Sequence, residues 1–243
     1  EPRKIYYYKK MGLVNEVFNE EKLSAFPETN CGIGHVRYST TGSSNVVNAQ
    51  PVVFYGRWGR MAVAHNGNII NCDAIKSKLI KQGHIFQSSI DSEVIAALIN
   101  LYSENSLEEG VRRACEELVG AYAIVVMADS KLVAVRDPLG LKPLAIGDKH
   151  GDIMFASETC AIDSLAVIRD VKPGEIIVAD ENLSMRSSFL EQRHRRPCVF
   201  EYVYLARSDS KIDGVNVYDA RYECGKMLAE LYKIDADVVA GVP

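Results

Sequence analysis

The chain lacks the cysteine patterns that mark two common protein classes. Its six cysteines are scattered over positions 31, 72, 115, 160, 198 and 224, with no Cys-x-x-Cys pair and no tight Cys/His cluster. This spacing argues against a zinc site and against a disulfide-stapled secreted domain. Free thiols in a reducing cytoplasm are the simplest interpretation, and no metal site is predicted within the chain.

Excess positive charge and long apolar runs are also missing. The net charge of -4 and the pI near 5.8 give no electrostatic footprint for nucleic acid or for an anionic membrane. No apolar run is long enough to span a bilayer. The remaining composition, 47% hydrophobic and 25% charged, is that of a globular protein. A length of 243 residues suits one large domain, or one domain with part of another.

Short runs rich in Val, Ile and Tyr, separated by turn residues, dominate the first 180 residues and predict strands. The connectors Asp129-Ser130 and 148–151 have hairpin length, so neighbouring strands are expected to pair antiparallel. The predicted strands are 31–38, 60–65, 121–127, 132–135, 153–155 and 175–178.

Three helices are predicted between these strands. Asn71 can cap a helix that runs to Ile80, with Gly83 just beyond its end. A Ser or Asp at 89–91 can start the apolar stretch that follows. Ser106 and Glu109 form a capping-box pattern for a helix that ends near Leu118.

The end of the chain changes in character. Residues 186–197 are polar and basic and are typical of a connector, whereas 198–206, 218–232 and 237–243 predict a strand, a helix and a strand. A β-α-β progression differs from the hairpin-rich region before it. We therefore expect a domain boundary near 190–197, with the second domain only begun.

Four stretches carry residues suited to chemistry: 34–42, 64–69, 88–94 and 136–144. Arg37 offers a planar fork of donors that can hold a carboxylate at two points. The Asn66 amide and the Gly67 N–H can form an oxyanion hole. Asp91, near a helix start, can accept a hydrogen bond from an ammonium group. Together they suggest an amino-acid substrate attacked at a carbonyl, although a nucleophile is missing.

Each of these residues also has a purely structural interpretation. Asn66-Gly67 alone is more often a type I′ turn, and Asp91 alone is more often a helix N-cap. Arg37 is as readily a structural ion pair as a substrate clamp. His35 and His65 lie in apolar stretches, where packing histidines are expected.

Taken in order, the four stretches resemble the glutaminase domain of the class II, N-terminal-nucleophile glutamine amidotransferases. The similarity runs on through QPVVF (50–54), FASETCAID (155–163) and VKPGEIIV (171–178), and so covers residues 1–195. The resemblance implies an α+β fold, a four-layer αββα sandwich of two antiparallel sheets between helices. It also implies a site for L-glutamine.

The resemblance implies a role for each candidate residue. Arg37 would hold the α-carboxylate of glutamine, with Thr40 in the same loop, and Asp91 would take the α-ammonium. Asn66 and Gly67 would stabilise the tetrahedral oxyanion. The family nucleophile is an N-terminal cysteine whose own α-amino group acts as general base.

Residues 198–221 narrow the resemblance to the glutamine phosphoribosylpyrophosphate amidotransferases, which open de novo purine synthesis. Residues 196–243 would then begin an α/β phosphoribosyltransferase domain. There, ammonia would displace pyrophosphate from phosphoribosyl pyrophosphate, with Mg²⁺ bound to that substrate. The intact protein would be a cytoplasmic homo-oligomer. Some members hold a [4Fe–4S] cluster, for which Cys198 is a candidate ligand in the intact protein, and a plain buried cysteine is the alternative.

Cys31 begins a Cys-Gly-Ile sequence but is not expected to be the nucleophile. In the family, the nucleophilic cysteine stands well before the strand that delivers the arginine, whereas Cys31 lies in that strand. We therefore expect the nucleophile before Glu1 and the phosphate-binding loop beyond Pro243, which would leave this chain inactive by itself. The alternatives are another class II amidotransferase, such as a glucosamine-phosphate synthase or an asparagine synthetase, and a non-catalytic glutamine-binding module.

Overall fold

The structure is a computed structural model, and it places most of the chain. It describes residues 4–37, 45–57, 59–128, 130–149, 151–162, 167–191 and 193–241. Thr40, which the sequence assigns to the carboxylate loop, lies outside the described residues. Within the described residues, no helix is both long and apolar enough to cross a membrane.

The larger sheet has six antiparallel strands in the order β1-β2-β3-β4-β8-β9. The hairpin predicted at 129–130 is confirmed, since Ala128 of β3 pairs with Lys131 of β4. The strands are β1 Val52–Gly56, β2 Gly59–Ile69, β3 Gly120–Ala128, β4 Lys131–Arg136, β8 Glu175–Ala179 and β9 Met185–Phe189.

The smaller sheet has three antiparallel strands, β5 Ala145–Lys149, β6 Asp152–Ala156 and β7 Val167–Asp170, in the order β6-β5-β7. The hairpin predicted at 148–151 joins β5 to β6, with Lys149 opposite Asp152. A small apolar core fills the space between the two sheets. It consists of Ala123, Ala134, Leu144, Ile146, Val171 and Ile177.

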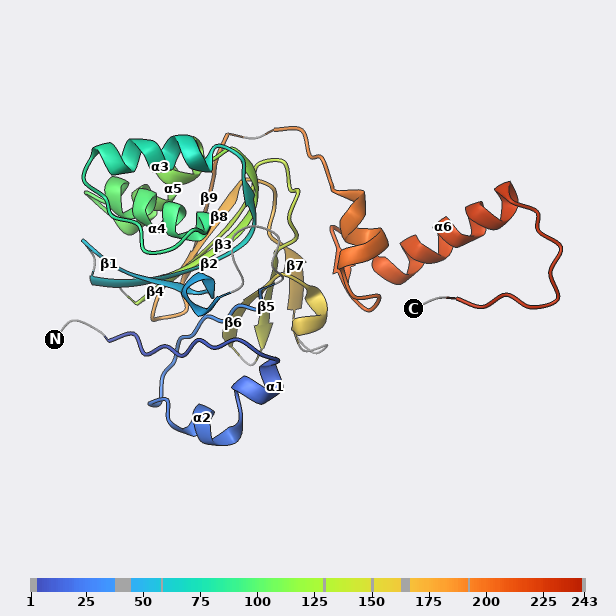
Figure 1. Cartoon of the computed structure of the whole chain (residues 1–243), viewed down its shortest axis with the longest axis horizontal. Helices are drawn as coiled ribbons and strands as arrows, with labels where there is room; N and C mark the ends of the chain where they lie inside the picture. The colour runs from blue at the N-terminus through green and yellow to red at the C-terminus, as the bar shows by residue number, and fades with distance from the viewer. Residues whose placement is uncertain are drawn as a thin grey trace.

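Three helices, α3 Cys72–Lys81, α4 Asp91–Tyr102 and α5 Leu107–Glu117, cover the other face of the larger sheet (Figure 1). The start of α5 forms as predicted, because the Ser106 side chain accepts a hydrogen bond from the Glu109 N–H. Gly83 follows α3 with φ +90°. The main core lies between these helices and the sheet and includes Val63, Ile95, Ile99, Tyr122 and Ile124.

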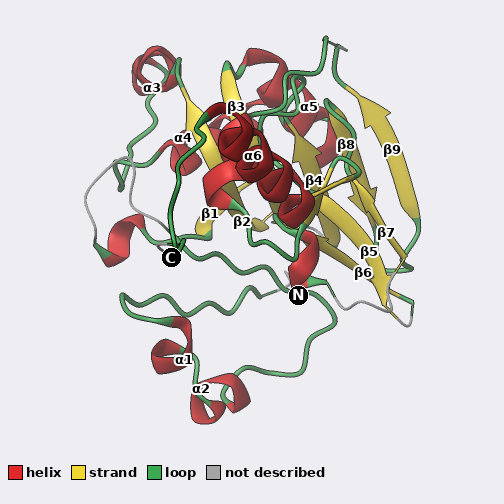
Figure 2. Cartoon of the chain, turned by 90° about the vertical axis from the view of Figure 1, so that its right-hand side faces the viewer, coloured by secondary structure: helices red, strands yellow, loops and turns green. Residues whose placement is uncertain are grey.

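This packing of two antiparallel sheets, with helices on the outer face of the larger sheet, confirms the predicted α+β class. Figure 2 shows the strands gathered in one half of the molecule, with the short helices α1 Val14–Val17 and α2 Glu20–Ser24 set apart from them. Strand β9 overlaps the start of the predicted connector 186–197, so the start of that connector is wrong. The side chains of β9 are all exposed, and an exposed edge strand has no apolar alternation that could reveal it.

Residues 31–37 are extended but belong to no sheet, which corrects the strand predicted at 31–38. Burial alternates strictly along the segment, with Cys31, Ile33, His35 and Arg37 turned inward. The alternation that predicted a strand is therefore present. The backbone hydrogen bonds of a strand are absent, because side chains already bond the edge of β2 beside His35.

The last fifty residues contain the helix α6 Val217–Leu231, as predicted, and a two-stranded ribbon of β10 Lys211–Ile212 and β11 Val215–Asn216. The strand predicted at 198–206 is wrong, because Glu201–Leu205 form the π-helix η3. The buried positions Glu201 and Ala206 are five residues apart, the spacing of a π-helical turn, and tertiary contacts override the β propensity of the aromatic residues. Residues 237–241 form no strand either.

Candidate functional site

Asn66 and Gly67 lie within β2, so the type I′ turn considered for them is wrong. Gly67 has φ +149°, and a Cβ atom there would lie 2.0 Å from the Ala121 carbonyl oxygen and 2.9 Å from His65 Nε2. Only glycine therefore fits at this position without moving the backbone of β3. The sequence pair Asn-Gly marks a close approach of two strands here, not a reversal of the chain.

The Gly67 N–H faces an open edge of the sheet. Strand β1 pairs with β2 only as far as Val63, and hydrogen bonds alternate between the two sides of an antiparallel strand. Ile70 N–H donates to the Val119 carbonyl on the β3 side, so the odd-numbered residues of β2 face the β1 side. No described residue accepts from the Gly67 N–H on that side. Within the described part of the chain, this donor has no acceptor and can receive a hydrogen-bond acceptor from a ligand.

The Asn66 side chain lies on the sheet face toward β5, β6 and β7. Its cross-strand neighbour Ala123 belongs to the core between the two sheets, and directly paired residues share a face. The side-chain amide makes no hydrogen bond to another described residue. The two predicted oxyanion donors are thus adjacent, one on the face and one at the edge of β2.

Asp91 is the first residue of α4 and lies at the same edge. Its Oδ2 accepts from the Ile69 N–H at 3.3 Å, and its Oδ1 lies 3.4 Å from His65 Nδ1. The N-cap alternative is wrong, because Ile90 occupies that position. Burial by itself raises the pKa of the Asp91 carboxyl, but the hydrogen bonds from His65 and the Ile69 N–H outweigh it and hold the pKa below its usual value. Asp91 is therefore an anion ready to receive a cation.

His65 has more than the packing role predicted for it. Its side chain is 1% exposed and points from β2 toward α4, where Nδ1 meets the Asp91 carboxylate. Its Nε2 is buried and has no hydrogen-bond partner in the described part of the chain. No sequence spacing connects positions 65 and 91, so only the fold reveals this pair.

Arg37 approaches the same edge through the extended segment 31–37. His35 Nε2 lies 3.1 Å from the His65 carbonyl oxygen, which fixes the segment beside β2. Arg37 follows two residues later and is turned to the same side as His35. Burial lowers the pKa of His35, so this imidazole is neutral at physiological pH. The fold brings Gly67 and Asp91 to one edge of β2, and the His35 contact brings the segment that carries Arg37 to the same edge.

The loop before α4 is held by the residues of its Ser-x-Asp-x-Glu motif. Glu93 accepts hydrogen bonds from the N–H groups of Gln87 and Ser88, at 2.8 and 2.6 Å. Ser89 bonds the buried Asn48, which donates to Ser89 Oγ at 3.0 Å and accepts from its N–H at 3.2 Å. The motif thus fixes the loop on both sides of Asp91.

The thiols offer no activated nucleophile. Burial raises the pKa of Cys31, and burial with the nearby Asp91 and Asp73 carboxylates raises that of Cys72 to about 11. A catalytic cysteine needs a lowered pKa, so nothing in the structure supports Cys31 as the attacking group. Among the described residues, no three His, Cys, Asp or Glu side chains gather to hold a metal ion. Cys198 as a cluster ligand stays a prediction.

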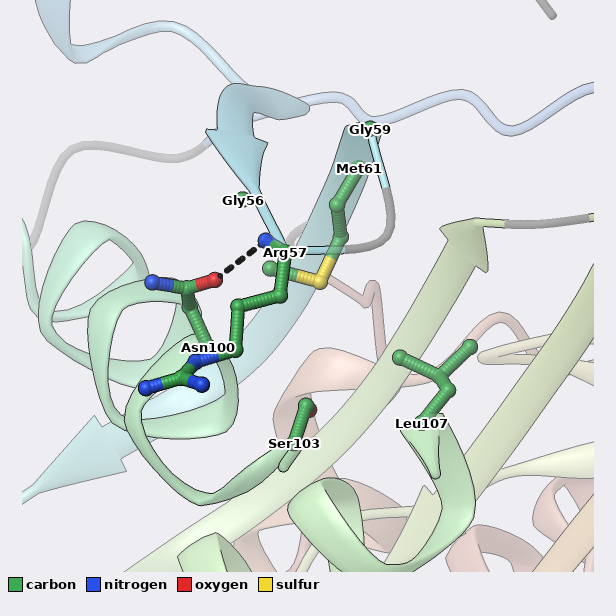
Figure 3. Close-up of a pocket in the computed structure, with 7 residues that line it drawn as sticks. All are labelled: Gly56, Arg57, Gly59, Met61, Asn100, Ser103 and Leu107. Carbon is green, nitrogen blue, oxygen red and sulfur yellow. Dashed lines mark hydrogen bonds between the residues drawn. The ribbon is translucent and has the colours of Figure 1, made fainter. Parts of the chain in front are cut away.

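A small pocket lies at the opposite end of β2. Figure 3 shows it beside Asn100, whose Oδ1 accepts from the Arg57 N–H at 2.8 Å. Six residues of strand, about 20 Å, separate Gly59 from the candidate site, so the pocket is unrelated to it. The lining residues are Gly56, Arg57, Gly59, Met61, Asn100, Ser103 and Leu107.

The fourth stretch, 136–144, serves a structural purpose. Arg136 is 1% exposed and pairs at two points with Asp213, at 2.7 and 2.9 Å. Lys142 Nζ donates to Glu201 at 2.6 Å. The stretch therefore attaches the C-terminal segment to the two-sheet body and contributes no group to the candidate site.

Comparison with known proteins gives a consistent result. Residues 35–164 match the model of the glutamine amidotransferase domain. Amidophosphoribosyltransferase from Methanocaldococcus jannaschii is 43% identical, over 99% of this chain and 55% of its own length, and that from Bacillus subtilis is 40% identical, over 99% and 51%. The chain thus spans about half the length of these relatives.

Solved structures agree with the sequence relatives. A structure described as the allosteric regulatory enzyme of purine biosynthesis matches with a TM-score of 0.87 and 41% identity, over 96% of this chain and 50% of the other. The glutamine phosphoribosylpyrophosphate amidotransferase of Bacillus subtilis, solved with ADP and GMP, matches with a TM-score of 0.84 and 39% identity, over 93% and 49%. The chain belongs to the glutamine amidotransferase family.

Proposed function

We propose that the chain is the glutaminase part of an amidophosphoribosyltransferase. It binds L-glutamine, and in the whole protein the nucleophile releases ammonia from the side-chain amide. The ammonia then displaces pyrophosphate from phosphoribosyl pyrophosphate to give phosphoribosylamine. The observation that carries the proposal is the edge of β2, where an open Gly67 N–H lies two residues from Ile69, whose N–H holds the Asp91 carboxylate.

The edge can bind each charged group of glutamine. The Asp91 carboxylate accepts from the α-ammonium, and the Arg37 guanidinium, with Thr40, holds the α-carboxylate. The side-chain carbonyl then lies at the Gly67 N–H and the Asn66 amide. As a thiolate adds to that carbon, the charge that develops on oxygen is stabilised by these two donors.

The attacking thiolate comes from an N-terminal cysteine, as in the family. The cysteine α-amino group takes the thiol proton, and the sulfur forms a bond to the amide carbon. The C–N bond then breaks, and the nitrogen leaves as ammonia after taking that proton from the α-amino group. Water then cleaves the glutamyl thioester to give glutamate and the free thiol. This chain supplies binding and oxyanion stabilisation for both steps.

The whole protein carries the remaining predictions. We propose a cytoplasmic homo-oligomer, while plant relatives named chloroplastic show that other compartments are used. Phosphoribosyl pyrophosphate with Mg²⁺ would bind to the predicted domain that begins at residue 196. A [4Fe–4S] cluster with Cys198 would need further thiolates from outside the described residues.

Isothermal titration of the 243-residue chain with L-glutamine and with N-acetyl-L-glutamine tests the proposal. The acetyl compound has no ammonium, so it cannot pair with Asp91 and should bind at least about tenfold more weakly. Equal affinities would remove Asp91 from the site. No binding of L-glutamine to the chain, combined with no glutamate release by the whole protein, would contradict the function itself.

A further inference from the structure

The Gln50 side chain takes the place of a backbone hydrogen-bond partner along β2. The register of the β1–β2 pair, with Val52 opposite Val63, places residue 50 opposite His65. The Gln50 side chain supplies the two bonds that a backbone would make there. Its Oε1 accepts from the His65 N–H at 2.7 Å and its Nε2 donates to the His65 carbonyl oxygen at 3.1 Å.

This bond pair ends the ladder directly before the candidate oxyanion donor. Along the outer edge of β2, His65 is bonded by Gln50, and Ile69 is bonded by Asp91. Gly67 lies between them, with its N–H facing the same edge and no described partner. If β1 continued as backbone from Val52 through residue 48, four residues further, residue 48 would lie opposite Gly67 and cover this donor. A side-chain amide ends the pairing and still satisfies His65.

The two bonds also fix where the Gly67 N–H lies. A glycine adds no side-chain packing to hold its own peptide plane, and Gly67 is in a backbone region open mainly to glycine. Its position is therefore set by its bonded neighbours. Asn48, two residues before Gln50, is 2% exposed and bonded to Ser89, so the chain that carries Gln50 is itself anchored.

We propose that Gln50 is a positioning residue for the oxyanion hole, acting through the His65 backbone on the Gly67 N–H. The inference rests on the proposed glutaminase function for its catalytic consequence, although the edge geometry stands without it. An oxyanion donor acts most strongly in the transition state, so its displacement lowers kcat and leaves KM nearly unchanged.

Gln50→Met in the full-length protein tests this role, with the exposed Gln82→Met as matched control. The Gln50 variant should hydrolyse glutamine with a kcat about 10- to 100-fold lower and a KM within about threefold of the parent. The control should match the parent in both. A kcat within about twofold of the parent, in a variant that melts normally, would overturn the proposal.

Gln50→Glu gives a rescue that a merely structural residue would not show. A protonated carboxyl can both accept and donate, as the amide does, whereas a carboxylate can only accept. The activity of this variant relative to the parent should therefore rise as the pH falls from about 8 toward about 5. A flat ratio, or one that falls, would count against the pair of bonds to His65.

Hydrogen exchange on the ¹⁵N-labelled chain separates this inference from the proposed function. In Gln50→Met the His65 N–H loses its acceptor, so it and the Gly67 N–H should both differ in exchange rate from the Gln82→Met control, His65 by about tenfold or more. If the parent hydrolyses no glutamine but these rates change, the function fails and the positioning stands. Unchanged rates at both positions would refute the positioning.

Discussion

Two polar regions of the larger sheet differ in their hydrogen bonding. One is the edge of β2 at Asn66 and Gly67, and the other is Arg136 at the end of β4, which pairs with Asp213. Asn66 pairs across the strands with Ala123, and Ala123 pairs with Arg136, so the three residues share a face within two strand spacings, about 10 Å. At the β2 end, the Gly67 N–H and the Asn66 amide have no described partners. At the β4 end, every donor is bonded.

The Arg136 guanidinium uses all five of its N–H groups. It donates to the carbonyl oxygens of Gly140, Lys142 and Val171 at 2.7–3.1 Å, and its remaining two bonds go to Asp213. A buried polar group that is fully bonded holds a structure together, whereas unbonded donors at an open edge can receive a ligand. Polar residues in the four stretches 34–42, 64–69, 88–94 and 136–144 therefore have different roles. The role depends on whether the fold supplies hydrogen-bond partners for their donors.

Removing the Arg136 side chain should have the largest effect on stability, because it removes the bonds to Asp213. Arg136→Met leaves the Asp213 carboxylate, 7% exposed, with Arg195 as its remaining cation. The free energy of unfolding should fall by about 3–5 kcal/mol, because one partner of a buried ion pair is left behind. Urea denaturation measures this.

Arg186→Met is the matched control for that change. Arg186 is 67% exposed and lies 3.5 Å from Glu108, so its loss should cost less than about 1 kcal/mol. An equal loss of unfolding free energy in the two variants would show that the Arg136–Asp213 pair does not stabilise the fold as its bonds imply.

Gly67→Ala should disturb the edge of β2 that carries the candidate oxyanion donors. The added methyl group would overlap the Ala121 carbonyl oxygen, so β2 and β3 must separate locally, at a cost of about 1–3 kcal/mol. L-Glutamine binding should be lost with it. Gly225→Ala in α6 is the control, since nothing lies within 4 Å of the new atom and a helix gains about 0.5–1 kcal/mol from the change. Calorimetric melting compares the two, and normal glutamine binding by Gly67→Ala would contradict the role assigned to this edge.

Asp91→Asn should weaken L-glutamine binding by about tenfold or more while leaving the fold intact. The amide keeps the size of the side chain but loses the charge that attracts the α-ammonium. Titration calorimetry measures the affinity, and Asp73→Asn, an exposed change in the first turn of α3, serves as control. A similar affinity in both variants would assign Asp91 a purely structural role at the start of α4.

The smallest expected effect is the pH dependence of that affinity. Because the pKa of Asp91 is held below its usual value, the carboxylate stays charged as the pH falls from about 8 to about 5. Over this range, the Asp91 contribution to glutamine binding should change less than about twofold. The same sign holds for stability: a lowered carboxyl pKa stabilises the fold above the unfolded pKa, and this contribution is lost as the pH drops through the folded pKa. A steep loss of affinity between pH ~7 and pH ~5 would mean that Asp91 titrates far higher than its surroundings imply.

Local patterns predicted the local structure well. Ser106 and Glu109 begin α5 as expected, and the hairpins at 129–130 and 148–151 form, because caps and short connectors depend on residues close in sequence. The alternative interpretation of Asn66-Gly67 as a turn and the prediction of a strand at 198–206 were wrong. In both places, distant contacts decide the conformation: the Ala121 backbone at Gly67, and the Lys142–Glu201 pair at η3.

Short motifs indicated the family, the alternation of strands and helices, and which polar residues were candidates for a role. Motif spacing and hydrophobic periodicity carry that information within short windows of the chain. Which of those residues meet could be seen only in the folded chain. Gln50 with His65, His65 with Asp91, and Arg136 with Asp213 are 15, 26 and 77 residues apart in the chain. Such pairs form only when strand register and helix packing bring the backbones together, because no local interaction links residues so far apart.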